Sequence, residues 1–518
     1  MTAERGLVVH LFARVDGPRA TAAVQALREV WRACADALAM GEAVSRTGLP
    51  TAFPAEPLHS LPAGPVAAMR NRDEGGGARQ ALLTRDHEVW ILSVSLDADP
   101  PEGTDQAEGA DAWRRLHGRW RSAVGRLPDD FLGAVYLHWA EARDTDPGRL
   151  REAVRTAAPD VPSATGWHEQ DTVTSAGWRL WEISPRVDTR AERHLLAVAP
   201  AGRKAALSRS IWMVGGPVPA PVVRYLLHAA KVRYQLRVWD GGRDLARIRR
   251  RAERTLNDVL PLVTEAADGT RPAADDDARL TAADRRLISL QADEAGLAEA
   301  LAGLRTMRRS VQIAAANMAT WAEVSGHAAQ PYGPFHDDQG LSAWLVQRLD
   351  DDESYLTAAR DRVHEVGAIA DRLLRRRLHE RDEAGRRRHE MFGLLQTAVI
   401  SSLLMALAAI QSLGFKVPVP GPVKPPIVLL LGGIVLAASA VSARLAFPGH
   451  GRAAGLLERT GTGLMLAALA WLVLAWLSPA LLGGLASPAA TWPTAGAGFV
   501  IGAALHAYLR RRSPSGVV

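Results

Sequence analysis

Residues 392–413 read FGLLQTAVISSLLMALAAIQSL, a run without a charged side chain. A helix needs about 20 mostly apolar residues to cross a bilayer. Further apolar runs follow at 427–443 and 462–482, and a shorter one at 494–509. This pattern predicts a transmembrane region of four helices over residues 392–512. The alternative for 494–509 is a helix that lies in the interface or enters the bilayer partway, because this run is short for a span.

Arginines flank the apolar runs in a one-sided pattern. They precede the first run, lie between the second and third, and follow the last. Cytoplasmic flanks of membrane helices are enriched in lysine and arginine. Four spans place every arginine-rich segment on one side, so we expect a multi-pass inner-membrane protein with its N-terminal region and C-terminus cytoplasmic. The juxtamembrane arginines expected to meet the lipid bilayer are Arg375, Arg376, Arg377, Arg386, Arg387, Arg388, Arg510, Arg511 and Arg512.

The apolar runs contain almost no ionisable residues. Their polar candidates are Gln396, Gln411 and His506, and His506 lies within one turn of the final arginines. Ion-coupled transporters usually place ionisable side chains within the bilayer, which argues against a coupled pump. Gly498 and Gly502 form a small-xxx-small pattern that lets helices approach closely. We expect helix packing there, either within the chain or between copies of a homo-oligomer.

Composition limits the remaining function classes. The chain has 518 residues, a formal net charge of +6 and a sequence pI near 9.8. The juxtamembrane arginines account for much of this charge, so a nucleic-acid partner is not expected. Cys34 is the single cysteine, which excludes an intramolecular disulfide and a cysteine-rich zinc site. The N-terminal segment does not read as a signal peptide, since its short apolar stretch is interrupted by His10.

Residues 1–240 alternate strand-like and helix-like segments and predict an α+β cytoplasmic domain. Within 89–96, Trp90, Leu92, Val94 and Leu96 share one face with period two. The ten tryptophans between positions 31 and 239 are expected in the core. Strands are expected at 7–14, 80–83, 89–96, 134–140, 178–184 and 193–199, and helices at 20–40, 110–126 and 220–240.

Residues 241–391 predict an α-helical coiled-coil stalk. A basic helix over 243–265 is expected to expose its arginines, and a polar linker follows at 266–277. A second helix begins near residue 337 after a break at 326–334, and is expected to continue into the first span. Pairing as an antiparallel hairpin and pairing between subunits both fit the pattern. The seven-residue series consist of Leu290, Leu297, Leu304, Val311 and Met318 in one helix, and of Leu356, Val363 and Ala370 with Ala359, Val366 and Leu373 in the other.

Catalytic motifs are missing from the sequence. No GxxxxGK[ST], HExxH or GxSxG pattern occurs. Cys34 lies mid-helix without a caspase-type signature and is interpreted as a buried structural thiol. His10 and His138 fall on predicted strands and are interpreted as core or edge residues. We therefore expect a non-enzymatic protein with no catalytic, metal or cofactor-binding residues.

The general plan resembles that of CorA-type magnesium channels, with a cytoplasmic domain, a long helix entering the bilayer and spans near the C-terminus. That family carries a Gly-Met-Asn motif after its first span. The corresponding loop here contains Gly414, Phe415, Lys416 and Val417 instead. Four expected spans also differ from that family's two, so the resemblance is limited to architecture.

A second resemblance rests on three segments of the N-terminal region. These are VVHLFA at 8–13, LREVWRAC at 27–34 and GLP at 48–50. Together with the layout of the chain, they resemble the actinobacterial CATRA conflict-system proteins, named for association with caspase-like and TPR-repeat partners. The resemblance implies a membrane-bound component of an antiviral or self/non-self response whose protease is a separate protein.

Three hypotheses follow from these patterns. The first is a membrane-anchored, non-enzymatic sensor or effector of a bacterial conflict system, acting with a separate caspase-like or TPR partner. Cleavage in the linkers at 266–277 or 326–334 offers one route to its activation. The alternative is a CorA-like oligomeric ion channel that lacks the Gly-Met-Asn motif. The third is an enzyme with an unrecognised site in the first 240 residues.

Overall fold

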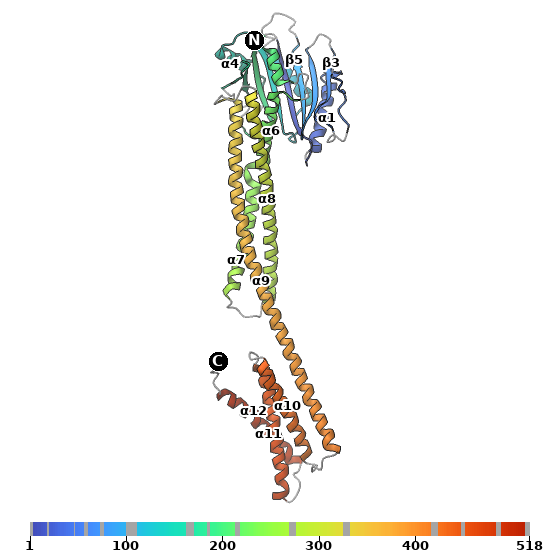
Figure 1. Cartoon of the computed structure of the whole chain (residues 1–518), viewed down its shortest axis with the longest axis vertical. Coiled ribbons are helices and arrows are strands. Elements are labelled where there is room, and N and C mark those ends of the chain that lie inside the picture. Colours follow the sequence, from blue (N-terminus) through green and yellow to red (C-terminus); the bar gives the residue numbers. More distant parts are fainter. Residues whose placement is uncertain are drawn as a thin grey trace. The chain divides into compact units, whose positions relative to one another are not determined.

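The structure, a computed structural model, describes residues 4–17, 20–45, 47–55, 61–72, 77–99, 111–161, 170–183, 187–212, 218–268, 276–324, 332–415, 423–446, 451–482 and 488–512. The chain divides into two compact units, Met1–Asp371 and Arg372–Val518. The first unit holds a β-sheet with its covering helices and a long helical part (Figure 1). The second is helical throughout its described residues.

The sheet has nine strands in the order β2-β3-β4-β5-β1-β6-β9-β8-β7. Neighbours are antiparallel except β6 and β9, which are parallel. The strands expected at 80–83 and 89–96 are confirmed as β4 and β5, which pair as a hairpin. The strands are β1 (Arg5–Arg14), β2 (Met40–Glu42), β3 (Gly64–Asn71), β4 (Arg79–Asp86), β5 (Val89–Asp97), β6 (Gly133–Ala142), β7 (Thr172–Val173), β8 (Arg179–Glu182) and β9 (Glu192–Pro200).

Helices cover both faces of the sheet. One face packs against α1 (Ala20–Asp36), α3 (Ala112–Val124) and α4 (Pro147–Ala157), and the other against α5 (Lys204–Ile211) and α6 (Pro221–Trp239). The predicted helix over 20–40 ends early, at Asp36, because Ala39 has a φ of 55° and Met40 begins β2.

Apolar side chains drive this packing as the sequence pattern predicts. The period-two face of β5, with Trp90 and Leu92, is completely covered by α1 and its neighbours. Among the ten tryptophans of this region, Trp167 lies outside the described residues. Seven of the other nine are buried, which confirms their expected role in the core: Trp31, Trp90, Trp113, Trp120, Trp139, Trp178 and Trp181.

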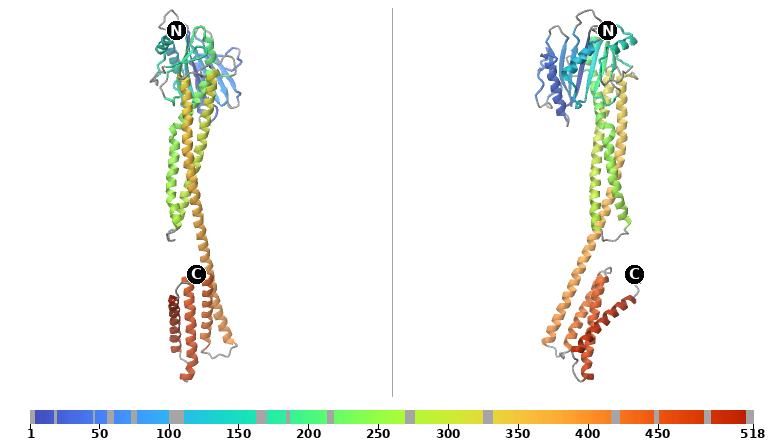
Figure 2. Two further views of the ribbon diagram at one scale, coloured as in Figure 1. Left: turned by 60° about the vertical axis from the view of Figure 1, so that its left-hand side comes forward. Right: turned by 180° about the vertical axis from the view of Figure 1, so that it is seen from behind.

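The helical part of the first unit is a bundle. Helix α6 passes through the turn η2 (Asp240–Gly242), where Asp240, Gly241 and Gly242 all have positive φ, into α7 (Arg243–Asp268). Helices α7, α8 (Asp276–Val324) and the first part of α9 (Pro334–Phe415) then run side by side (Figures 1 and 2). The linker centres expected at 266–277 and 326–334 lie largely outside the described residues.

The heptad positions of α8 point inward, as expected. Leu290, Leu297, Leu304, Val311 and Met318 are all buried. Polar contacts link α8 to α9. Arg305 Nε forms an ion pair with Glu353 Oε1 at 2.6 Å, and His364 Nδ1 lies 2.8 Å from Glu294 Oε1. The two helices therefore pack against each other within one chain.

The bundle differs from the expected two-helix hairpin because α7 also contributes an apolar stripe. Ala252, Leu256 and Val259 of α7 are buried in the same core as the α8 seam. The opposite face of α7 is solvated, as predicted, and exposes Arg247 and Arg250.

The second unit contains the last part of α9 and α10 (Lys424–Ala446), α11 (Gly451–Leu482) and α12 (Pro488–Arg512). Among the described residues, two helices are long and apolar enough to cross a membrane, through Lys424–Val441 and Gly455–Leu477. The apolar stretch Ile400–Ser412 of α9 is shorter. Helix α9 continues without interruption to Phe415, as the sequence predicts.

A candidate coupling site between the sheet and the helical bundle

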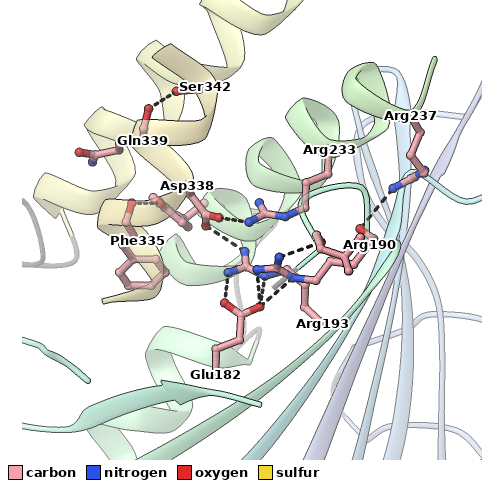
Figure 3. Close-up of polar contacts among 11 residues, drawn as sticks. Glu182, Arg190, Arg193, Arg233, Arg237, Phe335, Asp338, Gln339 and Ser342 are labelled. Atoms are coloured by element: carbon pink, nitrogen blue, oxygen red, sulfur yellow. Dashed lines mark hydrogen bonds and ion pairs between the residues drawn. The ribbon is translucent and has the colours of Figure 1, made fainter. Parts of the chain in front are cut away.

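The first turn of α9 places a carboxylate in the interior of the first unit. Asp338 is buried, and its side chain is completely inaccessible. Arg193 of β9 donates through Nη1 to Asp338 Oδ2 at 2.9 Å, and Nη2 of Arg233, on α6, lies 2.6 Å from Asp338 Oδ1. Asp338 thus joins a strand to two helices that are far apart in sequence (Figure 3).

A second carboxylate completes the network from the sheet side. Arg193 donates to Glu182, at the end of β8, through Nε at 2.9 Å and Nη2 at 2.8 Å. Arg190 also donates to Glu182 Oε1, through Nη2 at 2.9 Å. Bidentate arginine–carboxylate contacts fix both the distance and the relative orientation of the two side chains. We call Glu182, Arg190, Arg193, Arg233 and Asp338 the ionic joint.

Burial and charge act in opposite directions at the ionic joint. Burial disfavours the ionised form of Glu182, but Arg193, Arg190 and Arg233 outweigh this effect and hold its pKa well below the usual range. Burial likewise disfavours the charged guanidinium of Arg193, and Asp338 and Glu182 overcome it, which raises the pKa of Arg193. Glu182 and Arg193 therefore stay charged at neutral pH. Taking one partner away leaves a buried charge without compensation.

The chain immediately before the ionic joint is tightly placed. Gly333 has a φ of 92°, and a Cβ there would overlap the side chain of Thr172 in β7. The hydroxyl of Tyr225 in α6 donates to the carbonyl of Phe335 at 2.9 Å, and the two rings lie 4.2 Å apart. The start of α9 is therefore held by sheet and α6 together.

One further contact ties α9 to the turn between α6 and α7. Trp239 Nε1 donates to Asp352 Oδ2 at 2.8 Å, and the Trp239 ring makes an edge contact with Trp344. Gly242 lies so close to Asp352 that a Cβ would stand 2.9 Å from its Oδ2. The register between α9 and this turn is thus fixed about four helical turns beyond Asp338.

A cluster of neutral histidines lies on the opposite face of the sheet. His117 of α3 has its ring centroid 5.6 Å from that of His138 in β6 and 5.3 Å from that of His194 in β9, and Tyr136 stacks on His194 at 4.6 Å. Burial, followed by the charge of Arg121, lowers the pKa of His117 to about 4. Within the described part of the chain, no group of His, Cys, Asp or Glu is arranged to hold a metal ion.

The predicted juxtamembrane arginines belong to the second unit. Arg375, Arg376 and Arg386 are exposed along α9, and Arg377 is half-buried. Arg376 pairs with Glu380 at 3.0 Å. The side chains outside the described set are those of Arg387, Arg388, Arg510, Arg511 and Arg512.

Gly498 and Gly502 lie against α11 of the same chain. A Cβ on Gly498 would stand 2.9 Å from the Leu466 carbonyl, and one on Gly502 would stand 2.9 Å from that of Thr462. Their close approach thus packs α12 on α11, and it gives no separate reason to infer an oligomer. Cys34 is buried, and burial raises the pKa of its thiol to about 12, which makes it unreactive.

Two protein-family models match the chain. Residues 6–215 match the CASPASE and TPR Repeat-Associated N-terminal domain, CATRA-N, and residues 220–363 match the corresponding C-terminal domain, CATRA-C. The chain belongs to the CATRA family. This confirms the resemblance inferred from the sequence and links the protein to caspase- and TPR-associated conflict systems. No curated protein and no solved structure matches the chain.

The ionic joint crosses the boundary between the two CATRA regions. Glu182, Arg190 and Arg193 belong to CATRA-N, whereas Arg233 and Asp338 belong to CATRA-C. The sequence pattern does not reveal this site, because its members are individual charged residues from segments far apart in the chain. The one local signal is Arg193-His194 at the start of the apolar strand β9.

Proposed function

We propose that this CATRA protein is a membrane-anchored, non-enzymatic sensor or effector of a bacterial conflict system that acts with a separate caspase-like or TPR-repeat partner. The observation that carries the proposal is the continuity of α9. Helix α9 begins at Pro334, contributes Asp338 to the ionic joint near its start, and ends at Phe415 after the apolar segment. The family name supports the proposed class of partner.

Through the ionic joint, a change in the CATRA-N region can act on α9. Arg193 and Arg233 hold the two oxygens of Asp338 from a strand and from a helix, respectively. A partner that shifts β9 against α6 cannot preserve both contacts, because buried ion pairs tolerate little change in geometry. Such a shift therefore breaks or weakens a contact of Asp338 near the start of α9. The continuous helix then transmits the change toward residue 415.

The second unit supplies the proposed membrane segment. Two of its helices are long and apolar enough to span a bilayer. The part of α9 that precedes its apolar segment carries exposed arginines. These arginines suit anionic headgroups on the cytoplasmic side. The four-span arrangement with both ends cytoplasmic is part of the proposal.

Membrane potential in a bacterial host tests the effector role. We expect the full chain to depolarise the cells, as reported by a potential-sensitive dye, and a chain ending at His389 to leave the potential unchanged. The truncated chain keeps the ionic joint and the bundle but lacks the apolar helices.

A matched control keeps the spans but loosens their packing. Gly498→Leu with Gly502→Leu cannot seat α12 on α11, because both positions already touch α11 backbone. We expect this variant in the membrane fraction without depolarisation. An unchanged potential in cells that carry the full wild-type chain in their membranes would contradict an effector role and leave an anchored scaffold.

A further inference from the structure

A cavity of about 180 Å³ lies between α5 and the sheet. Val8 of β1, Ser95 and Asp97 of β5 and Trp139 of β6 form the floor, and Lys204 with Leu207 of α5 forms part of the opposite wall. This volume is below the roughly 300–1,000 Å³ of pockets for drug-sized ligands, so the cavity suits a smaller molecule.

The floor of the cavity is more polar than packing requires. On its other face, β5 presents Leu92, Val94 and Leu96, all fully buried in the core. On the cavity face the same strand presents Ser93, Ser95 and Asp97. Ser93 is buried, whereas Ser95 and Asp97 are half-buried. A buried polar group destabilises a protein unless it meets a partner.

The deepest of these polar groups is satisfied within the protein. Ser93 Oγ lies 2.8 Å from Nδ1 of His10, whose Nε2 donates to the Ile211 carbonyl at 3.1 Å. By contrast, the side chains of Ser95 and Asp97 have no hydrogen bond to any residue that the structure describes. Burial raises the pKa of Asp97, as expected for a carboxyl group partly withdrawn from water. The cavity therefore contains unused hydrogen-bonding capacity beside a satisfied pair.

Lys204 on the opposite wall offers a cation, and Trp139 in the floor offers an apolar surface beside it. Lys204 Nζ lies 5.1 Å from the ring centroid of Trp139 and 2.8 Å from Glu4 Oε2. The Trp139 indole packs directly against Gly6, because a Cβ at that position would overlap the ring. The Lys204 side chain is 44% exposed, so its ammonium remains accessible to a ligand.

We propose that this cavity binds a zwitterion of amino-acid size, with its ammonium group at Asp97, its carboxylate at Lys204 and an apolar side chain against Trp139 and Leu207. Opposite charges on the two walls match the two charged ends of an α-amino acid, and charge-assisted hydrogen bonds to both ends supply orientation. The indole and the aliphatic side chains of α5 favour an apolar ligand side chain. This site lies on the sheet and does not depend on the proposed membrane role.

Calorimetric titration of the full chain in mild detergent tests the proposal. The probes are the twenty free L-amino acids, with N-acetyl-leucine, leucinamide and Leu-Gly-Gly as blocked or extended forms. We expect saturable binding of at least one apolar amino acid and at least 10-fold weaker binding when either charged end is blocked. This comparison uses the wild-type chain, so no variant needs to fold.

Variants then assign the two charged contacts. We expect Asp97→Asn and Lys204→Gln each to weaken binding at least 10-fold, while the matched controls Asp99→Asn and Arg203→Gln bind like the wild type. Absence of saturable binding by all twenty amino acids would overturn the proposal. So would equal binding of leucine and N-acetyl-leucine, or binding of Leu-Gly-Gly without binding of any free amino acid.

Discussion

Asp338→Asn is expected to destabilise the first unit by about 3–5 kcal/mol, because it removes the negative charge between two buried arginines. Arg193 keeps its two-pronged contact with Glu182, but Arg233 loses its ion partner. The measurement is the midpoint of denaturant unfolding of the full chain in mild detergent, followed by tryptophan fluorescence.

Two comparisons separate this effect from a general loss of charge. Asp351→Asn removes a carboxylate from an exposed pair with Arg348 on the same helix and should cost less than about 1 kcal/mol. Adding Arg233→Met to Asp338→Asn should restore part of the loss, because it removes the uncompensated cation. Equal losses for Asp338→Asn and Asp351→Asn would contradict a buried ionic joint.

Acidification from pH 7 to pH 5 is expected to destabilise the first unit by several kcal/mol. Five histidines of this unit have lowered pKa values, and burial is the largest cause in each. The pKa is about 4 for three of them and about 3 for His194, and that of His138 lies well below its usual range. Below about pH 6.5 the unfolded chain binds protons on these groups, whereas the folded chain does not. The free energy of unfolding therefore decreases as the pH decreases. Each group contributes up to about 2 kcal/mol at pH 5. The three near 4 are His10, His117 and His228.

Other titrating groups do not reverse this trend. The lowered pKa of Glu182 costs stability only at more acidic pH, where the unfolded carboxylate begins to protonate. Asp97 and Glu192, whose pKa values burial raises, act in the opposite direction, but they are two groups against five.

A pair of histidine variants isolates the cause. His117→Gln removes a buried titrating group and should reduce the slope of unfolding free energy against pH by about 1.4 kcal/mol per pH unit between pH 6.5 and 4. His87→Gln replaces a ring that is 89% exposed and should leave the slope unchanged. Identical slopes in the two variants would rule out the buried histidines as the source.

Local periodicity was sufficient to predict several elements of the fold. The alternation in 89–96 predicts a strand with one covered face, and the series from Leu290 to Met318 predicts the inward face of α8. The absence of Pro or Gly-rich breaks between residues 337 and 413 predicts one continuous helix. Each of these inferences depends on neighbours within a few turns or residues.

The remaining features depend on contacts between distant segments. The parallel pairing of β6 with β9 leaves no local mark, and the two-residue strand β7 is too short for a period. Among its described residues, helix α7 buries Ala252, Leu256 and Val259 and packs Leu245, Ile248 and Val263 partly buried against the core. Charged residues separate these positions in the sequence, so the prediction rested on the basic surface of the helix. The ionic joint joins Arg193 to Asp338 across 145 positions, and no single segment shows that these charges are buried.

Labelling of single introduced cysteines tests the proposed four-span arrangement of the membrane segment. Cys34 is buried and unreactive, so it provides little background. Lys424→Cys begins α10, and Arg459→Cys lies among the arginines near the start of α11. In bacterial spheroplasts, we expect a membrane-impermeant maleimide to label Lys424→Cys from outside and to label Arg459→Cys only after lysis. Labelling of Arg459→Cys in intact spheroplasts, or of neither variant until lysis, would contradict this arrangement.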